Sequence, residues 1–212
     1  MGKLEENKKK KKQLLLDSSF DLFMKKGWLE TTISDIVKQA NVAKGTFYLY
    51  FKDKYDIRNK LISYKANQLL LNAHEDLINN HPEITDIKDQ IVHLMIFIVY
   101  ELKSNTSLLK FIAKNLSWGV FKSALDTTST TETDKVNFWD NFCLMIPENS
   151  ISEKEAEIMI FQITELVGSS VYNVILYDEP VEFEQFIPYL ERSVRAILAT
   201  YITDSNLPHQ LV

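Results

Sequence analysis

Apolar residues recur at the spacing of an α-helix along almost the whole chain. Leu16, Phe20 and Phe23 stand four and three residues apart, and similar steps return between residues 183 and 201. Such steps place apolar side chains on one face of a helix. The 212 residues include only five Gly and five Pro, which are few for a turn-rich β-sandwich or barrel. We therefore predict an all-α protein.

Breaks in this periodicity divide the chain into about nine helices. Gly27 follows two lysines and predicts a helix end, and Asn41 suits the left-handed conformation of a sharp turn. Ser152 and Glu155 form a capping box, which predicts a helix start. We expect helices at residues 8–26, 32–40, 44–51, 54–79, 85–103, 106–125, 134–146, 152–177 and 181–203.

Charge is distributed unevenly along the chain. Residues 1–65 carry 15 Lys or Arg and 8 Asp or Glu, whereas residues 66–212 carry 9 and 21, which together give the net charge of −5. A basic first third on an acidic body indicates that this third meets a polyanion. Lys8 to Lys12 supply five of the positive charges, either as an arm that touches phosphates or as a solubilising tail.

Several classes of function lack their sequence signals. The five glycines are too far apart for a glycine-rich phosphate loop. The histidines at 74, 81, 93 and 209 have no metal-ligand spacing with one another or with Cys143. No nucleophile motif appears. We therefore expect no enzyme, no metal and no cofactor.

Two features concern the cellular compartment. Cys143 is the single cysteine, so no internal disulfide is possible and a reducing setting is expected. The longest uninterrupted apolar run is Leu94 to Tyr100, far below the ~20 residues that cross a bilayer. We expect a cytoplasmic protein without a membrane partner.

Two short helices joined by a tight turn, at residues 32–51, form a candidate helix-turn-helix. One set of apolar residues can pack the pair together: Ile36, Ala40, Val42, Phe47 and Phe51. The second helix then presents outward a set that suits a major groove: Lys44, Gly45, Thr46, Tyr48 and Tyr50. An ordinary helical hairpin with an exposed aromatic rim is the alternative.

A family resemblance adds to this interpretation. The stretch TTISDIV at 31–37, then ANVAKGTFYLYFKDK at 40–54, resembles the N-terminal domain of the TetR family of bacterial transcriptional repressors. FMKKGW at 23–28 is similar to that family's first helix end. The resemblance implies a three-helix DNA-binding head at residues 1–52. It also implies a helical body at 53–212 that dimerises and binds a small ligand.

The resemblance also implies roles for single residues. It places Thr32 on a phosphate at the start of the second helix, Ser34 near base edges, and Lys54 on a phosphate at the start of the fourth helix. It places Lys44, Gly45 and Thr46 in the groove, with Tyr48 and Tyr50 touching backbone or bases. The family often has His where Tyr50 stands, so the phosphate contact of Tyr50 departs from its pattern.

Two helices near the end carry apolar stripes that suit a partner. The last helix has a heptad-like seam, and residues 152–177 are apolar on nearly all faces. The family pairs these helices into a four-helix dimer bundle; a central helix of a monomer is the alternative. The predicted dimer residues are Ile160, Ile163, Val167, Val171, Val174, Ile187, Leu190, Val194 and Ile197.

The middle of the chain is rich in aromatic residues. Few charges lie among them, which favours an apolar or aromatic effector over a polar one. Plain core packing is the alternative for each residue. The candidates for lining a pocket are Met95, Phe97, Tyr100, Phe111, Trp118, Phe121, Trp139 and Phe142.

The predicted function is a ligand-responsive regulator that acts as a repressor. It would bind a pseudo-palindromic operator as a homodimer, and a small effector would release it. The helix at 54–79 would carry the change from body to head. A helical protein-interaction module with a solubilising tail, without specific DNA binding, is the alternative.

Overall fold

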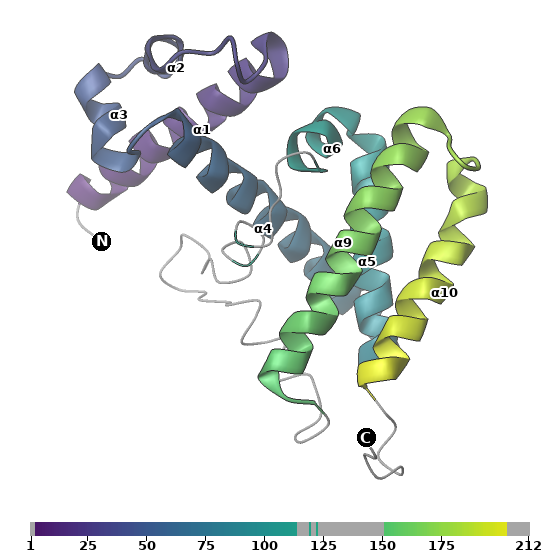
Figure 1. The fold of residues 1–212 in the computed structure, drawn as a ribbon. Coiled ribbons are helices and arrows are strands. Elements are labelled where there is room, and N and C mark those ends of the chain that lie inside the picture. Colours follow the sequence, from purple (N-terminus) through teal and green to yellow (C-terminus); the bar gives the residue numbers. More distant parts are fainter. Residues whose placement is uncertain (1–2, 114–118, 120–121, 123–150, 203–212) are drawn as a thin grey trace. The chain divides into compact units, whose positions relative to one another are not determined.

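A computed structural model describes residues 3–113, 119, 122 and 151–202. Every regular element in these residues is an α-helix, which confirms the predicted fold class (Figure 1). The predicted helix at 134–146 and the second half of that at 106–125 lie largely outside the described residues. The eight described helices are α1 (Lys3–Lys26), α2 (Ile33–Gln39), α3 (Lys44–Tyr50), α4 (Lys54–Asn80), α5 (Ile87–Ser104), α6 (Thr106–Ala113), α9 (Glu153–Tyr177) and α10 (Phe183–Tyr201).

The predicted helix ends are confirmed where local chemistry sets them. Gly27 adopts a φ of +88°, and its N–H donates to the carbonyl of Phe23 (3.1 Å), which closes α1. The Ser152 hydroxyl accepts from the Glu155 N–H (3.2 Å), and the Glu155 carboxylate accepts from the Ser152 N–H (2.8 Å). This capping box fixes the start of α9.

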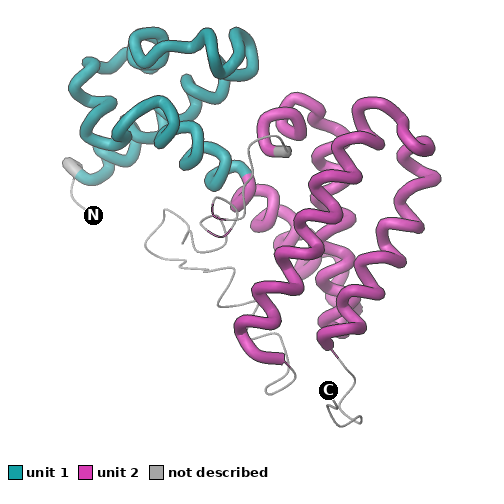
Figure 2. Tube along the Cα trace, viewed as in Figure 1, with its two compact units in different colours: residues 1–65 teal, residues 66–212 magenta. Residues whose placement is uncertain are grey.

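The chain divides into two compact units, residues 1–65 and 66–212 (Figure 2). Helix α4 begins in the first unit and ends in the second. The boundary predicted at residue 52 lies just before α4, whereas the units divide inside this helix. Unit 1 ends at the residue where the basic third of the sequence ends, so the charge asymmetry follows the division into units.

Each unit buries its own apolar core. In unit 1, Leu15 of α1, Phe47 of α3 and Ile57 of α4 are fully buried. In unit 2, α5, α9 and α10 lie side by side (Figure 1), and residues such as Val99 and Val194 have no exposed surface. Burial of this kind contributes the main favourable free energy of folding.

Helix α9 corrects one expectation from the sequence. Its 25 residues are long and apolar enough, by length and composition, to cross a membrane. The search for uninterrupted apolar runs missed it because uncharged polar residues such as Ser169 and Asn173 interrupt the run without adding charge. The helix instead packs against α10 and α6. Only 22% of the residues in its apolar window are buried within the protomer.

Candidate nucleic-acid interface

Helices α2 and α3 are joined by a turn that holds them against each other. Asn41 adopts a φ of 52°, in the left-handed region, and the N–H of Val42 donates to the carbonyl of Val37 (3.0 Å). Ile36 and Phe47 are fully buried between the helices, and Val42 is half-buried. The predicted packing of the pair is therefore confirmed.

The outer face of α3 is open to solvent. Lys44, Gly45 and Tyr48 are exposed, and Thr46 and Tyr50 are half-buried. Tyr48 keeps 53% of its surface exposed, a large value for an aromatic residue. No heavy atom lies within 4 Å of the position that a Cβ on Gly45 would take. The helix thus presents one cation, polar aromatic tips and bare backbone, which together suit a phosphate backbone and base edges.

The start of α2 is held by a reciprocal cap. The Thr32 hydroxyl accepts from the Asp35 N–H (3.1 Å) and donates to the Asp35 carboxylate (2.8 Å). Lys26, at the end of α1, forms an ion pair with the same carboxylate at 2.7 Å. The hydrogen bond from Lys26, followed by those from Thr32, holds the pKa of Asp35 far below its usual range. Ser34, in the first turn of α2, is exposed.

Thr32 has a local partner for its hydroxyl proton. The sequence-based role on a phosphate therefore requires this proton to leave Asp35. In the structure, Thr32 serves as the N-cap of α2, and its phosphate contact stays a prediction.

The Lys54 ammonium group has more hydrogen-bond partners than the Thr32 hydroxyl. Its ammonium group donates to the carbonyl oxygens of Trp28 (3.0 Å), Leu29 (3.1 Å) and Thr31 (2.9 Å), and it lies 4.4 Å from the centre of the Trp28 ring. An ammonium group has three N–H donors, so all three have partners within unit 1. Lys54 clamps the segment that leads into α2; its predicted phosphate contact is untested.

Trp28 contacts several residues of unit 1, and the sequence analysis did not predict this packing role. Its ring packs edge-on against Phe23 (5.4 Å) and Tyr55 (5.0 Å), and the Arg58 guanidinium lies 4.7 Å from its centre. These contacts join the end of α1 to the start of α4. An aromatic residue directly after a helix-ending Gly was the available signal.

The comparison with protein families decides the identity of this unit. Residues 15–61 match the family described as "Bacterial regulatory proteins, tetR family". This match identifies a TetR-family type of domain within unit 1. The matched family is one of regulatory proteins.

The two curated relatives described here match only part of the chain. The fatty acid metabolism regulator protein of Bacillus subtilis is 37% identical over 70 residues, which cover 33% of this chain and 36% of that protein. The biofilm operon negative regulator IcaR of Staphylococcus epidermidis is 32% identical over 68 residues, 31% and 37% of the two chains. The matched region thus spans about a third of these two relatives.

Solved structures share the fold over most of the chain. FadR from Bacillus halodurans has a TM-score of 0.54 at 19% identity, covering 87% of this chain and 94% of that one. Thermus thermophilus FadR, in complex with lauroyl-CoA, has a TM-score of 0.58 at 17% identity, covering 94% and 100%. At these identities the likeness shows the fold alone.

The lysine run lies within a helix and is not an irregular arm. Helix α1 begins at Lys3, with Glu5 and Glu6 in its first turn, so Lys8 to Lys12 lie inside the helix and most of them are exposed. The acidic residues of the first turn interact favourably with the positive end of the helix macrodipole. Whether these lysines contact DNA stays open as a prediction.

The predicted dimer residues divide into two groups in the structure. Ile163, Val171, Val174, Leu190 and Val194 are buried in the core of unit 2. Ile160, Val167, Ile187 and Ile197 are half-buried at its border. A separate set is exposed on the outer faces of α9 and α10: Ile158 (40%), Phe161 (40%), Tyr177 (58%) and Tyr189 (57%).

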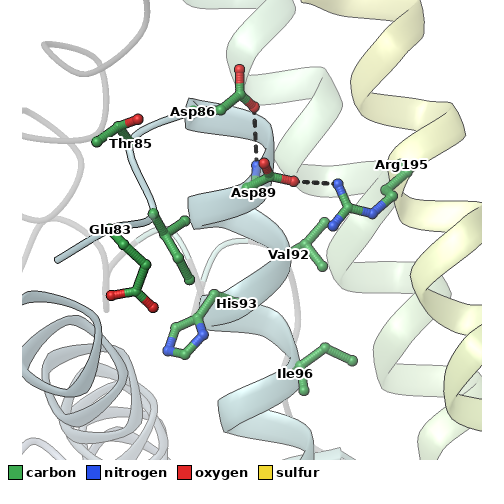
Figure 3. A pocket seen from close by; sticks show the side chains of 9 residues that line it. Glu83, Thr85, Asp86, Asp89, Val92, His93, Ile96 and Arg195 are labelled. Atoms are coloured by element: carbon green, nitrogen blue, oxygen red, sulfur yellow. Dashed lines mark hydrogen bonds and ion pairs between the residues drawn. The ribbon is translucent and has the colours of Figure 1, made fainter. Parts of the chain in front are cut away.

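None of the described pocket candidates lines one groove of unit 2, which lies beside α5 and α10. This groove has a volume of about 450 Å³ and a polar wall that includes Glu83, Asp89 and Arg195 (Figure 3). Asp89 of α5 pairs with Arg195 of α10 at 2.5 Å.

The aromatic set itself is scattered. Met95 and Phe111 are buried, Phe97 is partly buried, and the Tyr100 hydroxyl donates to Glu184 (3.0 Å) at the surface. The positions of Trp118, Phe121, Trp139 and Phe142 lie outside the described residues.

Proposed function

We propose that this chain is a ligand-responsive repressor that binds a pseudo-palindromic operator as a homodimer in the cytoplasm. The observation that carries the DNA-binding part is the outer face of α3. Lys44, Gly45 and Tyr48 are exposed there, over a pair of helices fixed by buried Ile36 and Phe47. A rigid helix with exposed groove-reading groups is what major-groove recognition requires.

The outer faces of α9 and α10 support the homodimer. Phe161 on α9 and Tyr189 on α10 leave large apolar surfaces in water within a single protomer. No heavy atom lies within 4 Å of a Cβ built on Gly168, so a second helix has room to approach α9 there. A large exposed apolar patch marks a partner surface. We place the interface on this outer face, with the half-buried Val167 and Ile197 at its edge.

A fatty acyl-CoA is the effector class that we propose to test first. The structures of FadR from Thermus thermophilus and Bacillus subtilis contain lauroyl-CoA and stearoyl-CoA. The aromatic-rich middle of this chain is consistent with an apolar tail. The groove beside Arg195 has charged residues on its wall, so we do not assign the acyl chain to it.

Helix α4 supports a coupling between effector and operator. It runs without interruption from Lys54, which clamps the segment before α2, to Asn80 in unit 2. An effector that prefers one arrangement of this helix lowers the affinity for DNA, and DNA lowers the affinity for the effector by the same factor. A coupling of about 1–3 kcal/mol gives a change of roughly 5- to 150-fold.

The DNA-binding part is tested by selection from random duplexes, followed by fluorescence anisotropy with the selected site. We expect a site with two inverted halves whose centres lie about one helical turn, or a multiple of it, apart. Recovery of asymmetric or single-stranded sites alone contradicts the proposal. Tyr48→Ala serves as the variant that loses an exposed contact without loss of core.

The effector part is tested by calorimetry with lauroyl-CoA and stearoyl-CoA, with and without the selected operator. Free coenzyme A is the control for the head group. We expect weaker acyl-CoA binding when operator is present. Equal affinity in both titrations leaves a DNA-binding protein that these compounds do not control.

A further inference from the structure

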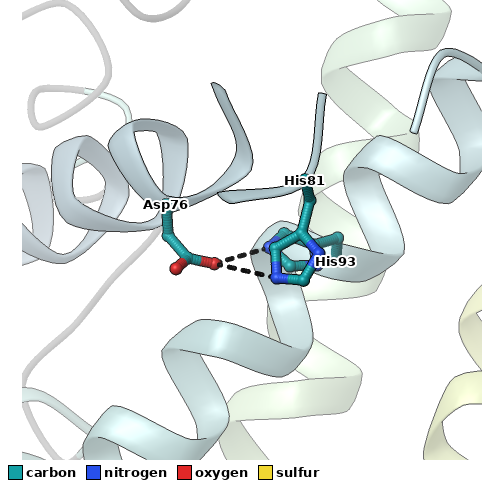
Figure 4. A group of neighbouring side chains, drawn as sticks. All are labelled: Asp76, His81 and His93. Atoms are coloured by element: carbon teal, nitrogen blue, oxygen red, sulfur yellow. Dashed lines mark hydrogen bonds and ion pairs between the residues drawn. The ribbon is translucent and has the colours of Figure 1, made fainter. Parts of the chain in front are cut away.

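Two histidines and one aspartate from separate segments of unit 2 meet at one point (Figure 4). Asp76 comes from the end of α4, His81 from the turn after it, and His93 from the middle of α5. One ligand atom of each lies within 4.8 Å of the other two. All three residues are half-buried, so the group is shielded but reachable from water.

The distances suit a small metal ion. The Asp76 Oδ2 atom lies 2.9 Å from His93 Nε2 and 3.9 Å from His81 Nε2. Bonds of about 2.0–2.1 Å to a tetrahedral zinc ion place its ligand atoms roughly 3.3 Å apart. The two observed separations lie on either side of that value, and the two histidine nitrogens lie within 4.8 Å of each other, so side-chain rotations would be needed to bring all three atoms to bonding distance.

Neighbouring groups orient these ligands. The Asn80 amide donates to Asp76 Oδ1 (2.8 Å), which leaves Oδ2 directed toward the histidines. His81 Nδ1 lies 3.3 Å from the Glu83 carboxylate, so a proton held on Nδ1 leaves Nε2 free of hydrogen. Metal-binding histidines commonly have such a carboxylate partner on the second ring nitrogen.

We propose that Asp76, His81 and His93 bind a divalent transition cation of the zinc type. Two imidazole nitrogens and one carboxylate oxygen suit zinc and its neighbours better than magnesium or calcium, which prefer oxygen ligands. Three protein ligands leave a coordination position for water or for a bound group. His93 also lines the groove beside Asp89 and Arg195, so the cation would sit next to a space that admits such a group.

Sequence spacing did not predict this site. The ligands stand at positions 76, 81 and 93, which match no short metal motif, and only the packing of α4 against its following turn and α5 brings them together. His74 also lies on α4 but is outside the group. It therefore provides a matched histidine control.

The test is calorimetric titration of the full chain with Zn²⁺ after removal of metals by a chelator, without DNA. We expect one ion per chain at this site. His81→Gln, His93→Gln and Asp76→Asn should each weaken binding by about 10- to 100-fold or more, and His74→Gln should leave it unchanged. Glu83→Gln should have a smaller effect than His81→Gln, because Glu83 acts through His81.

A second readout separates a built site from casual surface binding. Co²⁺ bound to two nitrogens and one oxygen in a four-coordinate site should give a strong visible absorption band. Zn²⁺ should displace the bound Co²⁺ and remove this band, whereas Mg²⁺ and Ca²⁺ should not. Circular dichroism confirms that each variant is folded. Equal zinc affinity in the wild type, His93→Gln and the His81→Gln/His93→Gln variant overturns the proposal, as does absence of binding by the wild type. Because no DNA is present, either result is independent of operator recognition.

Discussion

The Nζ atom of Lys54 lies 2.9 Å from the carbonyl oxygen of Thr31, 23 positions earlier in the chain. With the bonds to Trp28 and Leu29, this contact fastens the first turn of α4 to the segment that enters α2. Hydrogen bonds from α4 therefore fix the position of the segment that leads into the helix-turn-helix. A second lysine of α4, Lys60, donates to the Tyr50 carbonyl (3.2 Å) at the end of α3.

Replacement of Lys54 by Ala should therefore destabilise unit 1. Loss of a charged donor from three carbonyls should lower the free energy of unfolding by about 1–3 kcal/mol. Operator affinity should fall for all sequences alike. Urea unfolding followed by circular dichroism gives the first quantity, and anisotropy gives the second.

The salt dependence of DNA binding then separates the two roles of Lys54. A phosphate contact in addition to the clamp lowers the salt slope by about 1 in the variant. An unchanged slope assigns Lys54 to the clamp alone. Unaltered stability of the variant contradicts the clamp.

Gly45→Ala should separate folding from DNA binding. Nothing lies within 4 Å of the added Cβ, and Ala stabilises a helix relative to Gly by about 0.5–1 kcal/mol, so the variant should be at least as stable as the wild type. If DNA approaches the backbone at this point, the extra methyl should weaken operator binding. Full operator affinity in a folded variant removes Gly45 from the interface.

Thr46 and Lys44 should differ in the kind of affinity that they provide. Thr46→Ala should change the preferred base at one position of each half-site, since a base contact carries about 1–3 kcal/mol of discrimination. Lys44→Ala should weaken binding to specific and unrelated duplexes equally and lower the salt slope by about 1. Binding measured on a panel of single-base variants at several salt concentrations checks both. A uniform loss from both changes contradicts the assignment.

The cap of α2 should make stability depend on pH. Lys26 and Thr32 hold the pKa of Asp35 below its unfolded value of about 3.9, so its contribution is complete above that value and is lost as pH falls toward the folded pKa. Asp35→Asn should therefore be less stable than the wild type near neutral pH, and the gap should narrow in acid. Urea unfolding at about pH 7 and about pH 3 measures this difference. A gap of equal size at both pH values would count against the cap, and Lys26→Met should show a smaller pH dependence than the wild type.

The proposed dimer face is best tested at Phe161. Phe161→Glu places a charge on the exposed side of α9, which should leave the protomer folded but bury an unpaired charge in a dimer. Sedimentation should show dimer for the wild type and monomer for the variant. Ile78→Glu is the matched control, because Ile78 is 56% exposed and belongs to α4 rather than to α9 or α10. Leu190→Glu would not serve, because Leu190 lies in the protomer core and the change would unfold unit 2.

Local signals predicted most of the fold. Gly27, Asn41 and the Ser152–Glu155 cap each act within a few residues, so the sequence alone determined where these helices end. Periodicity also identified Ile36 and Phe47 as core. These features depend on backbone geometry and on one helix face, both of which a sequence displays directly.

Long-range placement accounts for what the sequence did not predict. A lysine at the start of a helix is usually exposed to solvent. The hydrogen bonds of the Lys54 ammonium group to three carbonyl oxygens become visible only in the folded structure. The stripe on α9 was apolar on several sides, and periodicity could not tell which side faces α10 and which faces outward. Asp76 and His93 are 17 positions apart, and their contact depends on how α4 and α5 pack.

The division of the chain into two compact units has a thermodynamic consequence. Phe47 and Ile57 belong to one core and Val99 and Val194 to another, so heat can melt the units in separate transitions. A single melting temperature would then describe neither unit. In a calorimetric scan with Zn²⁺, the transition of the unit that contains His93 should move upward, because a ligand stabilises only the folded form that binds it. Operator DNA should instead raise the melting temperature of the unit that contains α3. Zn²⁺ and operator DNA therefore identify which transition belongs to which unit.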